Sequence, residues 1–117
     1  MSNQRITDNL DSLLEVLPPE ITQALIDQGN SADLIEIILD LGRVPTARFT
    51  EMEVELTKNE VTKEEINYIV ERIGKFDGDN RAGLARTLHR IAAIRNRMGN
   101  IVGLTCRVGR AVYGTTE

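Results

Sequence analysis

The chain has 117 residues, of which 41% are apolar, 27% are charged and 3% are aromatic. This length and composition fit one small domain with an aliphatic core, and they exclude two large domains. No run of about 18 apolar residues is present for a transmembrane helix, and the first residues lack the pattern of a secretion signal. One cysteine, Cys106, and one histidine, His89, exclude an internal disulfide and a structural zinc site.

The net charge of −4 is the remainder of two halves of opposite charge. Residues 1–71 carry 15 acidic and 5 basic side chains, whereas residues 72–117 carry 9 basic and 3 acidic ones. Eight of the nine late basic residues are arginines, whose planar guanidinium binds carboxylate or phosphate at two points. This split predicts an acidic partner for the second half, or salt bridges between the halves.

The first 30 residues predict a helical hairpin. Leu10, Leu13, Leu14 and Leu17 have helical spacing behind Thr7, a candidate N-cap, and two prolines end the pattern. Pro19 suits the first turn of a second helix that Gly29 would end.

Strands are predicted in the next segment. Residues 35–41 are rich in β-branched side chains and precede turn residues, which favours a strand over a helix capped by Ser31. Residues 51–56 alternate apolar and acidic side chains, so Glu51, Glu53 and Glu55 would share a solvated or partner-facing side of a strand.

The second half predicts helices and then a β-hairpin. A helix should begin at Thr62, whose hydroxyl and Glu65 form a capping box, and end at Gly74. A short helix is expected over residues 80–88. Residues 89–97 and 101–108 then have the alternating pattern of strands on either side of a turn at Met98-Gly99-Asn100, which predicts a β-hairpin. One helix over residues 80–97 is an alternative.

These elements predict a single α+β domain. Residues 1–30 would be the helical hairpin and residues 31–117 the α+β body, with a small mixed sheet, one or two packed helices and a C-terminal β-hairpin.

No catalytic residue, metal ligand or cofactor site is expected within the chain. Cys106 and His89 could lie on neighbouring strands, but a cysteine in this setting is more typical of a buried strand residue, and His89 of a hydrogen-bonded histidine at a sheet edge. The sequence contains no Gly-x-x-x-x-Gly-Lys-Ser/Thr phosphate loop, so the chain alone should hydrolyse no ATP.

The late arginines remain as candidates for a binding site. On the predicted hairpin, Arg95, Arg97 and Arg107 would lie near one another, with Arg90 and Arg110 toward the opposite end. Such a set binds phosphates or a protein partner, and the alternative is a solvated basic face. The basic half offers only Phe76 and Tyr113 as aromatic platforms, which weakens a stacking single-strand binder.

Two long segments carry a family resemblance. They are DNRAGLARTLHRIAAIRNR (79–97) and GNIVGLTCRVGRAVYG (99–114), and weaker likeness begins at NLDSLLEVLPP (9–19). They resemble the N-terminal region of a cyanobacterial and plastid family of P-loop ATPases, related to stage III sporulation protein AA and, more distantly, to secretion ATPases.

The resemblance implies that this chain is a non-catalytic assembly or regulatory domain. ATP and Mg²⁺ would bind an ATPase module absent from this chain, and the partners would be that module and neighbouring subunits of a homo-oligomer. The five arginines would face nucleotide phosphates or a partner, in the cytoplasm or the plastid stroma.

Two other functions stay open. One is a small single-stranded nucleic-acid-binding domain that uses the basic half. The other is a protein-interaction module whose acidic strand face pairs with another subunit.

Overall fold

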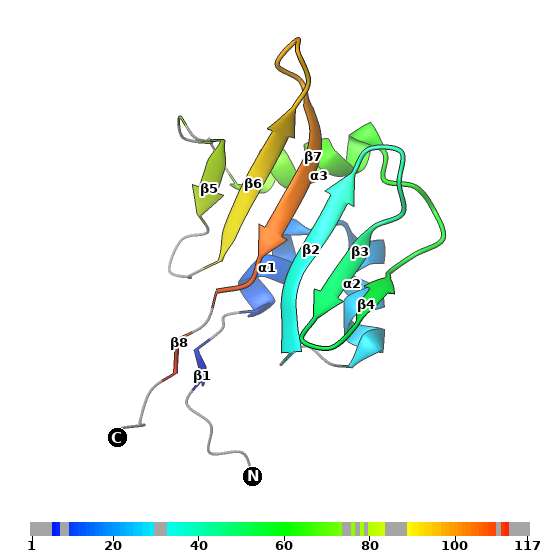
Figure 1. Cartoon of the computed structure of the whole chain (residues 1–117), viewed down its shortest axis with the longest axis vertical. Coiled ribbons are helices and arrows are strands. Elements are labelled where there is room, and N and C mark those ends of the chain that lie inside the picture. Colours follow the sequence, from blue (N-terminus) through cyan, green and yellow to red (C-terminus); the bar gives the residue numbers. More distant parts are fainter. Residues whose placement is uncertain are drawn as a thin grey trace.

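The computed structural model describes residues 6–7, 10–29, 33–73, 76, 78, 80–83, 89–109 and 111–112. In these residues it is an α+β fold with three helices and a six-stranded antiparallel sheet (Figure 1). The helices are α1 (Leu10–Val16), α2 (Pro19–Gln28) and α3 (Lys63–Ile73). The strands of the sheet are β2 (Leu34–Asp40), β3 (Thr46–Phe49), β4 (Glu53–Glu55), β5 (Arg81–Gly83), β6 (Arg90–Arg95) and β7 (Ile101–Arg107).

The six strands form two consecutive antiparallel meanders. Their order is β4-β3-β2-β7-β6-β5, so the first meander (β2–β4) and the second meander (β5–β7) meet where β2 pairs with β7. Helix α3 lies between them in sequence. The prediction of a mixed sheet is wrong, because every strand pair in the described residues is antiparallel; a parallel bridge joins only Leu41 and Val61.

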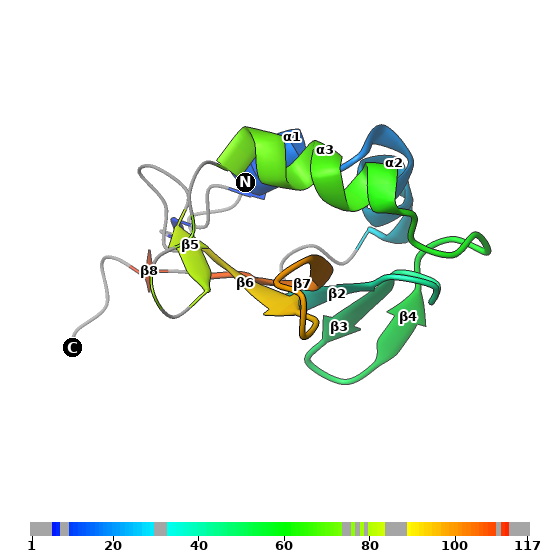
Figure 2. The same cartoon turned by 90° about the horizontal axis from the view of Figure 1, so that it is seen from above.

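The three helices cover one face of the sheet and leave the other face open (Figure 2). Alternation along each strand places one set of side chains under the helices. Ile37 and Leu39 of β2, Ile91 of β6 and Leu104 of β7 are all 0% exposed in this core. The helices contribute the other buried side chains, among them Leu13, Ile21, Ile66 and Ile69.

Local sequence signals explain where two of the helices begin or end. The Thr62 amide donates to Glu65 Oε1 at 2.9 Å, and the Glu65 amide donates to Thr62 Oγ1 at 3.2 Å, so the predicted capping box precedes α3. Pro19 occupies the first turn of α2, and Gly29 ends that helix with φ of 81°, where glycine avoids the strain of a side chain.

Four local expectations are wrong or incomplete. Thr7 caps no helix, because residues 6–7 form β1 and pair with β8 (Ala111–Val112). Residues 81–83 form β5 where a helix was expected. Residues 90–95 form β6, which excludes the alternative of one helix over residues 80–97. Strand β3 was not predicted. Residues 84–88, Ser31 and Gly74 lie outside the described residues.

Candidate functional site

The open face of the sheet carries its own pattern of side chains. Because Ile37 and Leu39 point into the core, Glu36, Ile38 and Asp40 lie on the open face. The strand registers extend this face across all six strands, since residues directly opposite each other in a ladder share a face.

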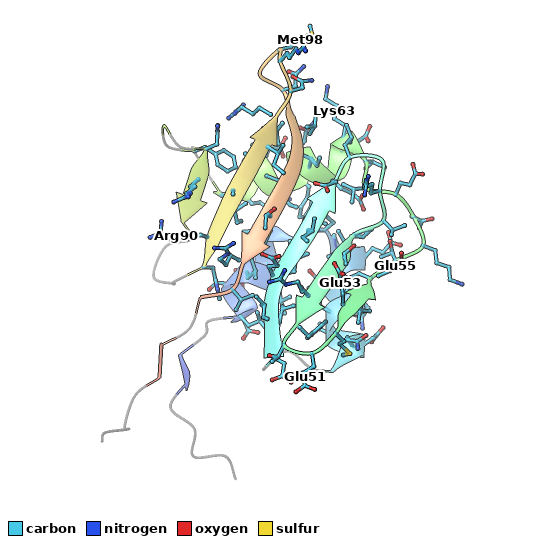
Figure 3. The ribbon with its side chains drawn as sticks, viewed as in Figure 1. Glu51, Glu53, Glu55, Lys63, Arg90 and Met98 are labelled. Atoms are coloured by element: carbon cyan, nitrogen blue, oxygen red, sulfur yellow. The ribbon has the colours of Figure 1, made fainter. Side chains whose placement is uncertain are left out.

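One row across the open face consists of charged side chains. In spatial order from β4 to β6 it contains Glu53, Arg48, Glu36, Arg107 and Arg90. The next row contains Glu55, Thr46, Ile38, Thr105, Ala92 and Arg81. The acidic side chains therefore gather toward β4 and the arginines toward β5 and β6, on opposite sides of the sheet (Figure 3).

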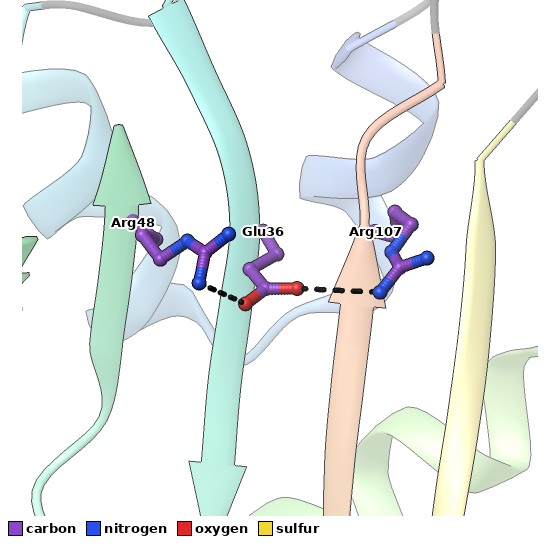
Figure 4. Close-up of polar contacts among 3 residues, drawn as sticks. All are labelled: Glu36, Arg48 and Arg107. Carbon is purple, nitrogen blue, oxygen red and sulfur yellow. Dashed lines mark ion pairs between the residues drawn. The ribbon is translucent and has the colours of Figure 1, made fainter. Parts of the chain in front are cut away.

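Glu36 connects the two meanders by ion pairs. Its carboxylate lies 3.6 Å from Arg48 Nη1 of β3 and 3.8 Å from Arg107 Nη2 of β7 (Figure 4). The side chain of Glu36 is 11% exposed, whereas those of Arg48 and Arg107 are 54% and 72% exposed. Both arginines can therefore also reach a ligand above the sheet.

A hollow lies on the basic side of the open face. Its volume is about 170 Å³, and it is lined by Arg81, Arg90, Ala92, Thr105 and Arg107. Three guanidinium groups and one hydroxyl thus surround a space of a size to hold a carboxylate group or another small anion. Arg90 forms no ion pair with any described residue, so its charge is available to a ligand.

The structure regroups the arginines singled out in the sequence. Arg107 lies opposite Arg90, and both line the hollow. Arg95 lies at the other end of β6, where it donates to Asn80 Oδ1 at 2.7 Å and to the Gly99 carbonyl at 2.8 Å. Arg97 is exposed in the turn between β6 and β7, and Arg110 lies outside the described residues.

Arg81 is the site residue that sequence reasoning missed. It lines the hollow because β5 pairs with β6 and sets Arg81 opposite Ala92. The segment was expected to be helical, and a strand of three residues has too little periodicity to reveal itself. The pairing of Arg90 with Arg107 depends on the register between β6 and β7, which shifts between Ile94 and Arg95 and therefore does not follow from the position of the turn alone.

Cys106 is buried, as expected, and His89, which was expected to be hydrogen-bonded at a sheet edge, is buried as well. Cys106 is 0% exposed, and burial raises the pKa of its thiol from 9.0 to about 12. His89 is 1% exposed, and its Nδ1 accepts a hydrogen bond from the Gly109 amide at 3.0 Å. Cys106 lies opposite Ile91 on β6. Because the thiolate is the nucleophilic form, a thiol with a pKa of about 12 is a poor nucleophile near neutral pH.

Two further searches concern the described part of the chain alone. It contains no group of three or more His, Cys, Asp or Glu side chains arranged to hold a metal ion. None of its helices has the length and apolar character needed to cross a membrane.

Comparison with known proteins finds three similar chains. Protein ycf45 of Porphyra purpurea is 49% identical over 110 residues, which cover 94% of this chain and 20% of that protein. SEEDLING PLASTID DEVELOPMENT 1 of Arabidopsis thaliana is 45% identical, covering 95% of this chain and 16% of that protein. Protein ycf45 of Cyanidium caldarium is 42% identical, covering 93% of this chain and 32% of that protein.

The chain therefore spans a third or less of the length of these curated relatives. No family model and no solved structure matches the chain. The plastid context expected from the sequence agrees with the name of the Arabidopsis relative.

The comparisons correct the family expected from the sequence. The similar chains are ycf45 and SEEDLING PLASTID DEVELOPMENT 1, and neither name denotes a P-loop ATPase, a sporulation protein or a secretion protein. The prediction of an ATPase assembly or regulatory domain is wrong on this finding, and single-stranded nucleic-acid binding finds no support in these relatives. The expectations for ATP and Mg²⁺ rested on the same resemblance and have no independent support.

Proposed function

We propose that this chain is a non-catalytic protein-docking domain whose open sheet face binds a carboxylate-bearing surface of a partner protein. The single observation that carries the proposal is the hollow of about 170 Å³ that Arg81, Arg90 and Arg107 surround. Guanidinium groups bind carboxylates through paired, charge-assisted hydrogen bonds, and Thr105 adds a hydroxyl donor. From the name of the Arabidopsis relative, we extend the proposal to a role in plastids.

The charges of the whole face favour a protein partner over a polyphosphate. Glu36, Glu53 and Glu55 share the face with the arginines, and they would repel a chain of phosphates laid across the sheet. A protein surface can instead present both signs of charge, each opposite its complement. The mixed pattern therefore suits a protein surface with carboxylates at one place and cations at another.

The chemistry of the described residues supports docking without catalysis. The thiol of Cys106 is buried and has a pKa of about 12, and His89 is enclosed by its surroundings. Neither side chain lines the hollow. None of the three relatives has a name that denotes an enzyme.

A binding titration tests the proposal. The probe is a fluorescently labelled polyglutamate peptide at low salt, with a polyglutamine peptide of equal length as the uncharged control. We expect saturable binding to the wild-type chain, and about a tenfold rise in Kd in Arg90→Glu, because that change sets a carboxylate in the hollow.

The matched control is Arg97→Glu, an equal change of charge at an exposed residue away from the hollow. It should alter Kd about twofold or less, because exposed charges beyond about 10 Å are largely screened. Equal weakening by the two variants would show that only net charge matters, and it would overturn the proposed site.

A further inference from the structure

The two meanders carry opposite charges on the open face. The first meander places four carboxylates and one arginine there: Glu36, Asp40, Arg48, Glu53 and Glu55. The second meander places three arginines there: Arg81, Arg90 and Arg107. Among the described residues the formal balance is −3 against +3, so one half of the face is the electrostatic complement of the other half.

We infer that the carboxylate-bearing partner is a second copy of this chain, docked face to face through the open sheet. This inference rests on the proposed docking function and identifies its partner. Homodimers are most often two-fold symmetric, so the same patch of each copy must fit itself. A face with one acidic and one basic half meets this requirement when each half meets the opposite half of the other copy.

The charge pattern selects one of the two symmetry axes that would stack the sheets. A two-fold axis parallel to the strands sets β4 of one copy over β5 and β6 of the other, so Glu55 lies over Arg81. An axis perpendicular to the strands sets β4 over β4, so Glu53 and Glu55 would meet the same carboxylates of the other copy. Like charges brought together cost several kcal/mol, so the second arrangement is the less favourable of the two.

The favoured axis also brings opposite charges together in the row that contains Glu36 and Arg107. It passes between β2 and β7 and brings Glu36 of each copy over Arg107 of the other. Arg90 then lies over Arg48, but Glu36 and Glu53 flank Arg48 on both sides, so Arg90 meets a net negative surface. Arg90, which pairs with no described residue in one copy, thereby gains partners.

The centre of the face is suited to close contact. Ile38, Ala92 and Thr105 are half-buried there, and Ile94 is 49% exposed although it is a large apolar side chain. Gly103 keeps the centre flat, because a Cβ at this residue would lie 2.6 Å from Asp40 Oδ1 and 3.4 Å from Ile94 Cδ1. A second copy would cover Ile94 and remove its apolar surface from water.

The area of the open face determines how tightly the two copies should bind. Six strands spaced about 4.8 Å apart, several of them short, give a contact on the order of 500 Å² per copy. Stable complexes bury about 800 Å² per partner, so we expect a weak dimer that depends on concentration and salt.

Two complementary variants test the inference by sedimentation velocity over a wide concentration range. The first variant, Glu53→Arg with Glu55→Arg, changes the formal charge balance of the described open face from 0 to +4; the second, Arg81→Glu with Arg90→Glu, changes it from 0 to −4. We expect the wild-type chain to dimerise, each variant alone to raise the dimer Kd at least about tenfold, and an equimolar mixture to form heterodimers. The four changed sites, and the two control sites described next, are all exposed, so folding is checked by circular dichroism alone.

The matched controls are Arg97→Glu and Glu64→Arg, which reverse charges outside the open face and should leave the dimer unchanged. A wild-type chain that is monomeric at every concentration overturns the self-association, as does a mixture of the two variants that stays monomeric. Polyglutamate binding to such a monomer would leave the docking function intact with a different protein as partner. Absence of both self-association and polyglutamate binding would remove the docking function as well.

Discussion

The two meanders have the same architecture and opposite surfaces. Each consists of three antiparallel strands, and each places apolar side chains under the helices: Ile37 and Leu39 in the first, Ile91 and Leu104 in the second. On the open face the first meander is acidic and the second is basic. Packing against helices fixes one side of both meanders, whereas the open side is free to differ because solvent accepts either charge.

The two oppositely charged halves of the sequence correspond to the two meanders of the sheet. The acidic residues 1–71 contain the whole first meander, and the basic residues 72–117 contain the whole second meander. Of the two alternatives that the sequence allowed, a salt bridge between the halves is present, because Glu36 of β2 pairs with Arg107 of β7. An acidic partner for the second half stays a prediction, and Arg90, which forms no ion pair with a described residue, is the side chain most suited to it.

The largest expected effect tests whether the covered faces of the two meanders are equivalent. Ile37→Ala and Leu104→Ala should each lower the free energy of unfolding by about 3 kcal/mol, because both side chains are 0% exposed and their removal leaves a cavity. Ile38→Ala, next in sequence but on the open face, should cost about 1 kcal/mol. Urea denaturation measures all three, and equal losses at Ile37 and Ile38 would contradict the assignment of the two faces.

An intermediate effect concerns the thiol in the core of the second meander. The pKa of Cys106 is about 12 when folded and 9.0 ordinarily, so above pH 9 the unfolded chain loses this proton while the folded chain retains it. Stability should therefore fall as pH rises, by roughly 1.4 kcal/mol at about pH 10. The difference between wild type and Cys106→Ala across pH 8–10.5 isolates this effect, and a difference independent of pH would contradict it.

The smallest effect concerns the ion pairs that join the meanders. Glu36→Gln should lower the free energy of unfolding by about 0.5 kcal/mol, because Arg48 and Arg107 are more than half exposed and water replaces the lost carboxylate. Urea denaturation at low and high salt measures it, and the difference from wild type should shrink as salt is added. A loss above about 2 kcal/mol would mean that this contact, rather than the shared core, holds the meanders together.

Elements with strong local signals were predictable from the sequence. The capping box of Thr62 and Glu65 identified the start of α3, and the β-branched residues of 35–41 identified β2. Strands β3 and β5 have four and three residues, too few for periodicity, and they form because a neighbouring strand offers a ladder of hydrogen bonds. A local sequence pattern carries no information about such pairing with another strand.

The candidate site was predictable only in part for the same reason. Arginine content indicated an anion-binding role for the second half, and Arg90 and Arg107 were among the residues singled out. Their grouping depends on the register between β6 and β7, which separates Arg107 from Arg95, and on β5, which brings in Arg81. The acidic half of the face depends further on β2 and β7 becoming neighbours across the middle of the chain.

Chemical-shift mapping by NMR tests the central claim, docking through the open face, most directly. A labelled wild-type chain is titrated with the polyglutamate peptide, and the backbone amide signals of the strands and of the helices are followed together. The account predicts that the largest shifts fall at Arg90, Ala92, Thr105 and Arg107, around the hollow. Shifts concentrated on α1, α2 and α3, or in the turn at residues 96–100, would contradict it.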